Sequence, residues 1–177
     1  ALQLAPLVFV RPGELRAAEW KDIDLDAGEW AFTASKTKTP HVVPLSRQAV
    51  EILREIQPLT GHARFVFPGL RTDDKPMSNN AILSAMRYLG IAKDVMTGHG
   101  FRAMARTLLH ERLKFPAEVI EHQLAHKVSD SLGAAYNRTK FLDDRKRMMQ
   151  EWADYLDRLK VGAEVIPINP NAVNVHL

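Results

Sequence analysis

The sequence contains no cysteine. This absence excludes a disulfide scaffold, a cysteine nucleophile and a thiolate metal site, and it suits a reducing compartment. No stretch approaches the roughly 18 consecutive apolar residues of a membrane-spanning helix, so we expect no membrane partner. The opening residues are too few for a secretory signal. Because no Met begins the chain, we expect it to be part of a longer protein.

The chain also has almost no excess of charge of either sign. Lys and Arg (24) only slightly outnumber Asp and Glu (21), which leaves a formal net charge of +3. This small surplus permits a local basic patch but does not establish nucleic-acid binding. The 177 residues, of which 46% are hydrophobic, suffice for one domain with a sizeable core.

The first part of the chain predicts short helices and a small sheet. Residues 1–10 are apolar and have the character of a helix end, which Arg11-Pro12-Gly13 breaks. Pro12 suits the first position of a new helix, which we expect to end near Trp20. From Gly28 the hydrophobic period changes to two, which indicates strands. We place these strands at 30–33 and 41–44, around a polar turn at 35–40, with a third short strand at 65–68.

The rest of the chain predicts helices. Ser46 suits an N-cap, and apolar residues follow it at helical spacing from Ala49 to Ile56. We expect further helices at 78–88, capped by Ser78, and at 101–113, 116–124, 129–137 and 141–159. The last of these should bury Met148, Met149, Trp152, Leu156 and Leu159. With an extended tail at 161–177, the fold class is mainly α with a small antiparallel β-sheet (α+β).

Six side chains are candidates for chemistry. His99 and Arg102 stand three positions apart at the start of a predicted helix, where this spacing points both side chains the same way. Tyr136 follows His126 and sits in Ala-Ala-Tyr-Asn-Arg. In chain order the candidates are Arg11, Lys36, His99, Arg102, His126 and Tyr136.

The sequence resembles the tyrosine recombinases, and among them the phage and prophage integrases. The matching blocks run in the family's order and spacing over about residues 1–160, and together they are a specific signal. They are Arg-Pro-Gly-Glu-Leu-Arg-Ala-Ala-Glu-Trp (11–20), Lys36 before His-Val-Val-Pro-Leu-Ser (41–46), His-Gly-Phe-Arg (99–102), Leu-Ala-His (124–126) and Ala-Tyr-Asn-Arg (135–138).

The resemblance implies a catalytic domain at residues 1–160 that cuts and rejoins DNA through a covalent 3′-phosphotyrosine, without a metal, ATP or another cofactor. Tyr136 would be the nucleophile, Arg11 and Arg102 would hold the scissile phosphate, and Lys36 would be the general acid. His99 and His126 would assist. The fold implied is that of the integrase catalytic domain, and the family's N-terminal DNA-binding domains are absent from this chain.

The same resemblance implies partners and a setting. The partner would be double-stranded DNA at attachment sites, bound by a homo-tetramer during synapsis, while the isolated chain could be a monomer. The cytoplasm of a bacterial host, at the nucleoid, would be the location. Two other functions stay open: a catalytically silent DNA-binding or assembly module of the same fold, and a topoisomerase activity of type IB.

The chemistry of phosphodiester cleavage requires these residue types, independently of the resemblance. A free tyrosine has a pKa of about 10, so attack by its oxygen needs a base or a strong positive field. Two guanidinium groups are good donors to the charged oxygens of a pentacovalent phosphorus. Lysine can release a proton to the leaving oxygen, whereas arginine, with a pKa above about 12, is a poor acid.

Each candidate also has an ordinary structural interpretation. Tyr136 could be a half-buried core residue, Arg11 could merely cap or pair with Glu14, and His99 could cap the helix that follows it. His126 could be a core or surface histidine. Lys38 competes with Lys36 for the role of general acid, since both lie in one turn, and the family pattern favours Lys36.

Other basic residues have a solvated helix face as their default interpretation, and some should touch DNA phosphates. Among the candidates for DNA contact are Arg16, Lys38, Arg106, Lys127 and Arg138. The remaining basic residues of this group are Lys140, Arg145, Lys146 and Arg147. Two departures from the family pattern are Ala125, where many relatives have glycine, and Ser35, where relatives often have a bulkier apolar residue.

A metal site is poorly supported. Asp22-Ile-Asp24-Leu-Asp26 resembles the start of a calcium loop, but Ala27 and Thr33 stand where that loop needs glycine and glutamate. His122 and His126 have the spacing of a zinc pair without the surrounding motif. We therefore expect no metal.

Overall fold

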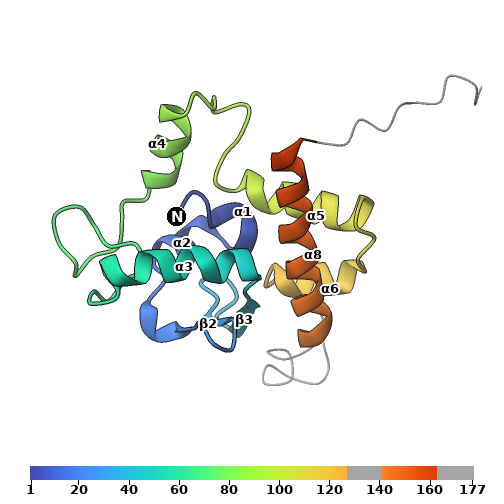
Figure 1. The fold of residues 1–177 in the computed structure, drawn as a ribbon, viewed down its shortest axis with the longest axis horizontal. Coiled ribbons are helices and arrows are strands. Elements are labelled where there is room, and N and C mark those ends of the chain that lie inside the picture. The colour runs from blue at the N-terminus through green and yellow to red at the C-terminus, as the bar shows by residue number, and fades with distance from the viewer. Residues whose placement is uncertain (127–140, 163–177) are drawn as a thin grey trace, which may run out of the picture.

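The computed structural model describes residues 1–126 and 141–162 (Figure 1). In this part of the chain, helices surround one small antiparallel sheet, which confirms the predicted fold class. The helix expected at 129–137, and the tail beyond Gly162, lie outside the described residues. The helices are α1 (Ala5–Val8), α2 (Pro12–Arg16), the 3₁₀ turn η1 (Trp20–Asp22), α3 (Arg47–Thr60), α4 (Ala81–Tyr88), α5 (Gly100–Glu111), α6 (Ala117–Gln123) and α8 (Leu142–Val161), and the strands are β1 (Ile23–Asp24), β2 (Glu29–Thr33) and β3 (Pro40–Pro44).

The sheet has the order β1-β2-β3, with both pairings antiparallel. β2 and β3 pair over their full length, from Glu29 opposite Pro44 to Thr33 opposite Pro40. Gly28 lies in the turn between β1 and β2, and its φ of +64° is one that glycine adopts without strain. The β2–β3 hairpin carries the turn with Lys36 at its tip.

The third strand is not where the sequence predicts it. Residues 65–68 form only isolated bridges, Phe65 with Glu19 and Pro68 with Pro76. Two prolines facing each other have no N–H with which to extend a ladder. The edge of β2 is covered instead by β1, which needs only the short turn at Gly28 to reach it.

Helix starts are partly as predicted. Ser46 is the N-cap of α3, and its hydroxyl accepts a hydrogen bond from the main-chain nitrogen of Ala49 at 3.3 Å. Ser78 does not cap α4, which begins at Ala81 after Asn80. The main-chain oxygen of Ser78 accepts from the nitrogen of Ala81 at 3.1 Å, so Ser78 belongs to the turn before the helix. The helix after Arg11 ends at Arg16, well before Trp20.

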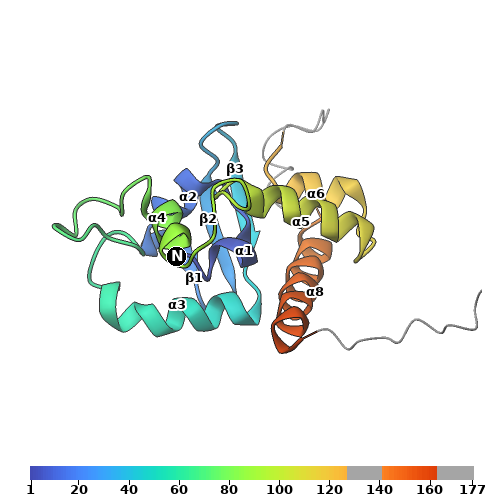
Figure 2. The same ribbon diagram turned by 90° about the horizontal axis from the view of Figure 1, so that it is seen from above.

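The core is built around α1, which packs against α3, α5 and α8 (Figures 1 and 2). Trp152 of α8 donates from its indole nitrogen to the main-chain oxygen of Pro6 at 2.8 Å. Met148, Met149 and Trp152 are fully buried, as predicted. Leu159 is 48% exposed, so its predicted burial is wrong: it lies in the last turns of α8, beyond the core.

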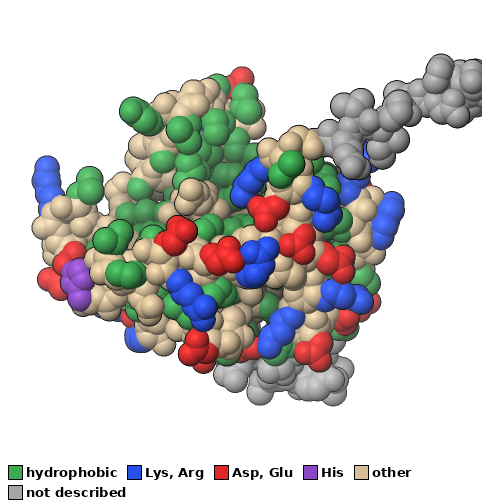
Figure 3. Space-filling model, in the orientation of Figure 1, with side chains coloured by type: hydrophobic (Ala, Val, Ile, Leu, Met, Phe, Trp, Pro, Cys, Tyr) green, Lys and Arg blue, Asp and Glu red, His purple; other side chains and the backbone are tan. Residues whose placement is uncertain are grey.

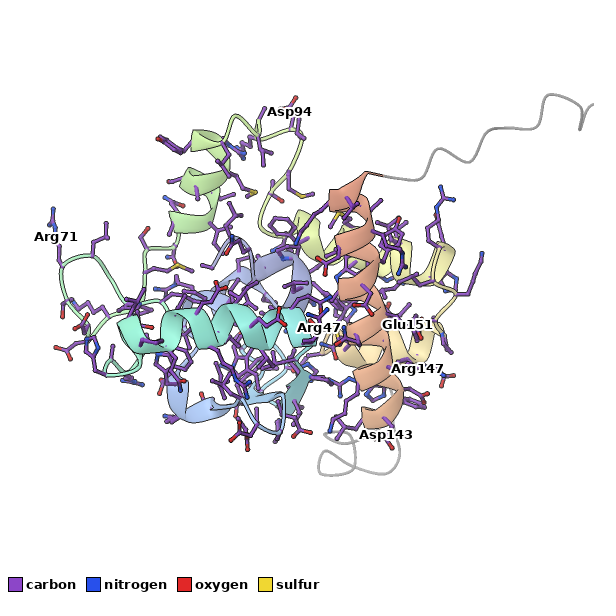
Figure 4. The ribbon with its side chains drawn as sticks, viewed as in Figure 1. Arg47, Arg71, Asp94, Asp143, Arg147 and Glu151 are labelled. Carbon is purple, nitrogen blue, oxygen red and sulfur yellow. The ribbon has the colours of Figure 1, made fainter. Side chains whose placement is uncertain are left out.

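Arg145 and Arg147 of α8 have opposite environments. Arg147 is exposed and pairs with Asp144 at 3.5 Å and Glu151 at 4.0 Å, which confirms the expected solvated face. Figure 4 shows Arg147 and Glu151 on α8. Arg145, by contrast, is completely buried, which corrects the same expectation for that residue. Its Nε donates to Oε1 of Gln123 at 2.9 Å and its Nη2 to the main-chain oxygen of Val42. Arg145 therefore ties the start of α8 to α6 and β3.

The surface over α3 and α8 mixes acidic and basic side chains, whereas apolar side chains gather over α4 (Figure 3). The exposed large apolar residues there include Tyr88, Leu89 and Val95. In the described part of the chain, no helix combines the length and apolarity needed to cross a membrane.

Candidate active site

Arg11 lies directly before α2, and its neighbour Glu14 holds it in place. The main-chain nitrogen of Arg11 donates to Oε2 of Glu14 at 3.1 Å, and Nη1 donates to Oε1 at 3.0 Å. The pairing with Glu14 that the sequence offered as an alternative is therefore present. It does not occupy the whole guanidinium, because Nη2 donates to the main-chain oxygen of Ala125 at 3.2 Å.

Arg102 projects from the first turn of α5 and is buried, with 7% of its surface exposed. Its Nη1 donates to the main-chain oxygen of Phe9 at 2.9 Å, and its Nη2 donates to that of Leu124 at 2.7 Å. Burial, and then the charge of Arg11, lower the pKa of Arg102 to about 10. The guanidinium therefore stays charged at neutral pH, in surroundings that a bound anion would improve.

The end of α6 collects these side chains on successive carbonyl groups. Nε2 of His41 lies 3.1 Å from the main-chain oxygen of Gln123, and Arg102 and Arg11 reach those of Leu124 and Ala125. A helix C-terminus presents carbonyl oxygens without helical partners and a partial negative charge, both of which suit cations. Arg11 and Arg102 are thereby brought to one place, although they are far apart in the sequence.

A tight turn after α6 places His126. The nitrogen of Ala125 donates to the oxygen of His122 at 3.0 Å, and the nitrogen of His126 donates to that of Glu121 at 3.1 Å. These two bonds define a Schellman motif, whose C′ residue is usually glycine in the left-handed region. Ala125 occupies that position with φ of +48°. The departure from the family's glycine thus leaves the turn intact, with alanine in a strained conformation.

His126 faces the arginine pair from this turn. Its Nε2 lies 3.4 Å from Nη2 of Arg102, and its Nδ1 bonds Oε2 of Glu121. The ring is 43% exposed, so it is not a core histidine. His126 therefore belongs to the cluster of Arg11 and Arg102.

The hairpin turn with Lys36 is tied to the same cluster through Glu14. Both the main-chain nitrogen and the hydroxyl of Ser35 donate to Oε1 of Glu14 at 3.0 Å. Lys36 follows immediately and is exposed, as is Lys38, which has φ of +56°. The serine that departs from the family pattern is the residue that makes this connection.

His99 lies at the N-terminus of α5 and is exposed. Its side chain makes no capping hydrogen bond, so capping does not account for it. A Cβ at Gly98 would lie 3.1 Å from Cγ of Pro12. Gly98, which precedes His99, therefore packs against Pro12, which follows Arg11. This contact brings the start of α5 close to the start of α2.

Three of the predicted site residues, Tyr136, Lys127 and Arg138, lie outside the described residues. Two other candidates for DNA contact have protein partners. Arg16 donates from Nη1 to the main-chain oxygen of Met77 at 3.0 Å, and Arg106 donates from Nε to Oε1 of Glu121 at 2.6 Å. In the described part of the chain, no group of three or more His, Asp or Glu side chains is placed to hold a metal ion.

Sequence reasoning missed three polar residues that organise the site. Glu14 is 7% exposed, and the sequence considered it only as a partner for Arg11. His41 was part of a matching block but was not singled out, although burial, with the charge of Arg145 second, lowers its pKa to about 3. Glu121 stood five residues before His126 without a recognisable motif, because only the turn at Ala125 brings the two together.

Comparison with known proteins identifies the family of the chain. Residues 1–142 match the Phage integrase family, and the chain belongs to that family. The chain is 40% identical over 173 residues to the integrase of Enterobacteria phage P4, covering 89% of this chain and 39% of that protein. It is 42% identical over 164 residues to the prophage integrase IntZ of Escherichia coli (strain K12), covering 92% of this chain and 40% of that protein. The chain therefore spans well under half the length of these curated relatives.

Solved structures share the fold. The integrase from mycobacterium phage Brujita matches with a TM-score of 0.64 at 19% identity, over 85% of this chain and 50% of that one. A lambda integrase tetramer bound to a Holliday junction matches with a TM-score of 0.52 at 23% identity, over 81% of this chain and 41% of that one. At these identities the likeness concerns the fold.

Proposed function

We propose that residues 1–160 are the catalytic domain of a site-specific DNA recombinase, followed by a tail at 161–177. The domain cleaves and rejoins DNA strands through a covalent 3′-phosphotyrosine during integration or excision of a mobile element. One observation carries the proposal: Arg11 and Arg102 reach the neighbouring carbonyl oxygens of Ala125 and Leu124. Membership of the Phage integrase family supports it.

The arginine pair suits a phosphate. Each guanidinium has five N–H donors, and the hydrogen bonds to carbonyl oxygens and to Glu14 leave donors on both groups for a further acceptor. Two positive charges held close together repel each other, and an anion between them removes that repulsion. In the transition state, negative charge builds up on the non-bridging oxygens of the phosphate. The arginine pair therefore stabilises the transition state more than the ground state, and this difference accelerates cleavage.

The other candidate residues have roles in the chemical step. The phenol oxygen of Tyr136 attacks the phosphorus and loses its proton, and the bond to the 5′-oxygen breaks. Lys36 gives the leaving oxygen a proton, while His99 and His126 contact the phosphate or accept the phenol proton. The phosphotyrosine keeps the energy of the broken bond, so rejoining requires no ATP, and no step requires a metal.

Double-stranded DNA at an attachment site is the proposed substrate, bound by a homo-tetramer during synapsis in the cytoplasm of a bacterial host. The solved lambda integrase structures support this partner, since one is a dimer bound to a core site and another is a tetramer bound to a Holliday junction. Lys38, Lys127 and Arg138 remain proposed DNA contacts.

A trapped adduct tests the proposal. The chain is incubated with a nicked duplex that carries its core site, so that the cleaved strand end diffuses away and the intermediate accumulates. We expect an adduct that resists SDS, that forms equally well in EDTA, and whose modified peptide contains Tyr136 by mass spectrometry. Tyr136→Phe is the matched control, and it should bind DNA as the wild type does without forming the adduct.

Other outcomes would identify the alternatives. DNA binding without any adduct would indicate the silent module. Relaxation of supercoiled plasmids that lack the core site would indicate a topoisomerase. Complete loss of the adduct in EDTA would indicate metal-dependent cleavage.

A further inference from the structure

Glu121 contacts His126 through both its main chain and its side chain. The main-chain oxygen of Glu121 accepts from the nitrogen of His126 at 3.1 Å, and its Oε2 bonds Nδ1 of the imidazole. Its other oxygen, Oε1, accepts from Nε of Arg106 at 2.6 Å. The carboxylate is therefore held from one side by Arg106 and holds the imidazole on the other.

These contacts define the proton positions on His126. A carboxylate accepts hydrogen bonds, so Nδ1 of His126 must carry the proton that it donates to Glu121. The opposite nitrogen, Nε2, lies 3.4 Å from Nη2 of Arg102, and a guanidinium can only donate. The neutral ring is consequently protonated on Nδ1, and the lone pair of Nε2 faces the arginine cluster.

The charge state of Glu121 agrees with this role. Partial burial alone raises the pKa of its carboxyl group, but the hydrogen bonds and charges of His126 and Arg106 outweigh burial and lower that pKa below its ordinary value. The group is thus a carboxylate at neutral pH.

We propose that Glu121 is the positioning residue for His126 in the cleavage reaction, with Arg106 holding Glu121. By accepting the hydrogen bond from Nδ1, Glu121 directs Nε2 toward the arginine cluster. There Nε2 can accept the phenol proton during cleavage and return it to the phenol oxygen when the strand is rejoined. This proposal rests on the proposed function. It also gives Arg106 a role within the protein rather than on DNA.

The ring itself provides the first test. The imidazole nitrogens of His126 in the full chain are observed by ¹⁵N NMR at about pH 8, where an ordinary histidine is neutral. We expect protonated Nδ1 in the wild type and a shift toward protonated Nε2 in Glu121→Ala. Glu118→Gln, an exposed position on the same helix, is the control and should leave the spectrum unchanged. An unchanged tautomer in Glu121→Ala would overturn the proposal.

Adduct formation provides the second test. Positioned acid–base groups contribute roughly 100- to 10,000-fold to rates, so we expect Glu121→Gln to slow adduct formation by about 10- to 100-fold, and Glu121→Asp to recover part of that loss. Glu118→Gln should react as the wild type does. A changed tautomer with an unchanged rate would also overturn the proposal. If the wild type forms no adduct, the proposed function fails, while the spectra still decide how Glu121 positions the ring.

Discussion

Glu14 accepts two hydrogen bonds from Ser35, one from its main-chain nitrogen and one from its hydroxyl, both on Oε1 at 3.0 Å. The same oxygen also accepts from Nη1 of Arg11 at 3.0 Å. One buried carboxylate thus fixes the position of Arg11 relative to the turn that carries Lys36. If Lys36 is the general acid and Arg11 binds the phosphate, as we propose, the distance between acid and phosphate depends on this carboxylate.

Replacing Glu14 should therefore affect stability and catalysis together. Glu14→Gln removes the charge that pairs with Arg11 in a buried place, and such losses cost about 1–3 kcal/mol. We expect the free energy of unfolding in urea to fall by that amount and adduct formation to slow. Glu55→Gln, an exposed position on α3, is the control and should change neither measurement. Wild-type behaviour of Glu14→Gln would show that the carboxylate does not organise the site.

Arg102→Lys should be far more harmful than its conserved charge suggests. A lysine lacks the planar fork that reaches the oxygens of Phe9 and Leu124 at once. Loss of one donor to a developing oxyanion costs roughly 100- to 1,000-fold in rate, and we expect a loss of that size in single-turnover adduct formation. Arg112→Lys, at the exposed C-cap of α5, should react normally. A similar rate for both variants would remove Arg102 from the reaction.

Ala125→Gly should stabilise the protein. Ala125 has φ of +48°, and a left-handed conformation costs a non-glycine residue roughly 1–2 kcal/mol. Glycine removes this strain but adds freedom to the unfolded chain, so we expect a net gain of about 0.5–1 kcal/mol in urea denaturation. The matched substitution Ala103→Gly, on the exposed face of α5, should instead lose about 0.5–1 kcal/mol. Destabilisation by Ala125→Gly would contradict the strain.

His41 should make stability depend on pH. Burial lowers the pKa of His41 to about 3 in the folded protein. Between about pH 6.5 and pH 3 this histidine is therefore protonated in the unfolded chain and neutral in the folded protein. The contribution of His41 to the free energy of unfolding is fully present above pH 6.5. It is lost as the pH falls toward 3, on the order of 1 kcal/mol per pH unit. We expect denaturation curves of His41→Gln to depend less on pH across that range. Equal slopes for the two proteins would show that His41 is protonated in the folded state.

The fold could be predicted where a local pattern determines it. The apolar spacing that starts at Ala49 and the cluster around Trp152 both predicted packed helices, because each reflects one buried face. β1 has only two residues and no periodicity, and its pairing depends on the turn at Gly28. Arg145 has the sequence context of a surface residue, and it is buried because Gln123 and Val42, distant in sequence, supply its acceptors.

The site shows the same division. Family blocks predicted Arg11, Arg102 and His126 as one group, and the geometry brings these three together. No sequence pattern indicated that Glu121 contacts His126, since their contact depends on a reversal of the main chain. The grouping of these three side chains could therefore be predicted from the sequence, whereas the polar groups that hold them depend on tertiary contacts.

The carbonyl groups of Gln123, Leu124 and Ala125 support side chains from three separate parts of the chain. Because this support is main chain, no single replacement there can delete it, yet a small tilt of α6 would displace both arginines and the hairpin histidine simultaneously. Core substitutions that shift α6 should consequently displace all three side chains at once and slow adduct formation. The effects of two such substitutions on the rate should combine non-additively.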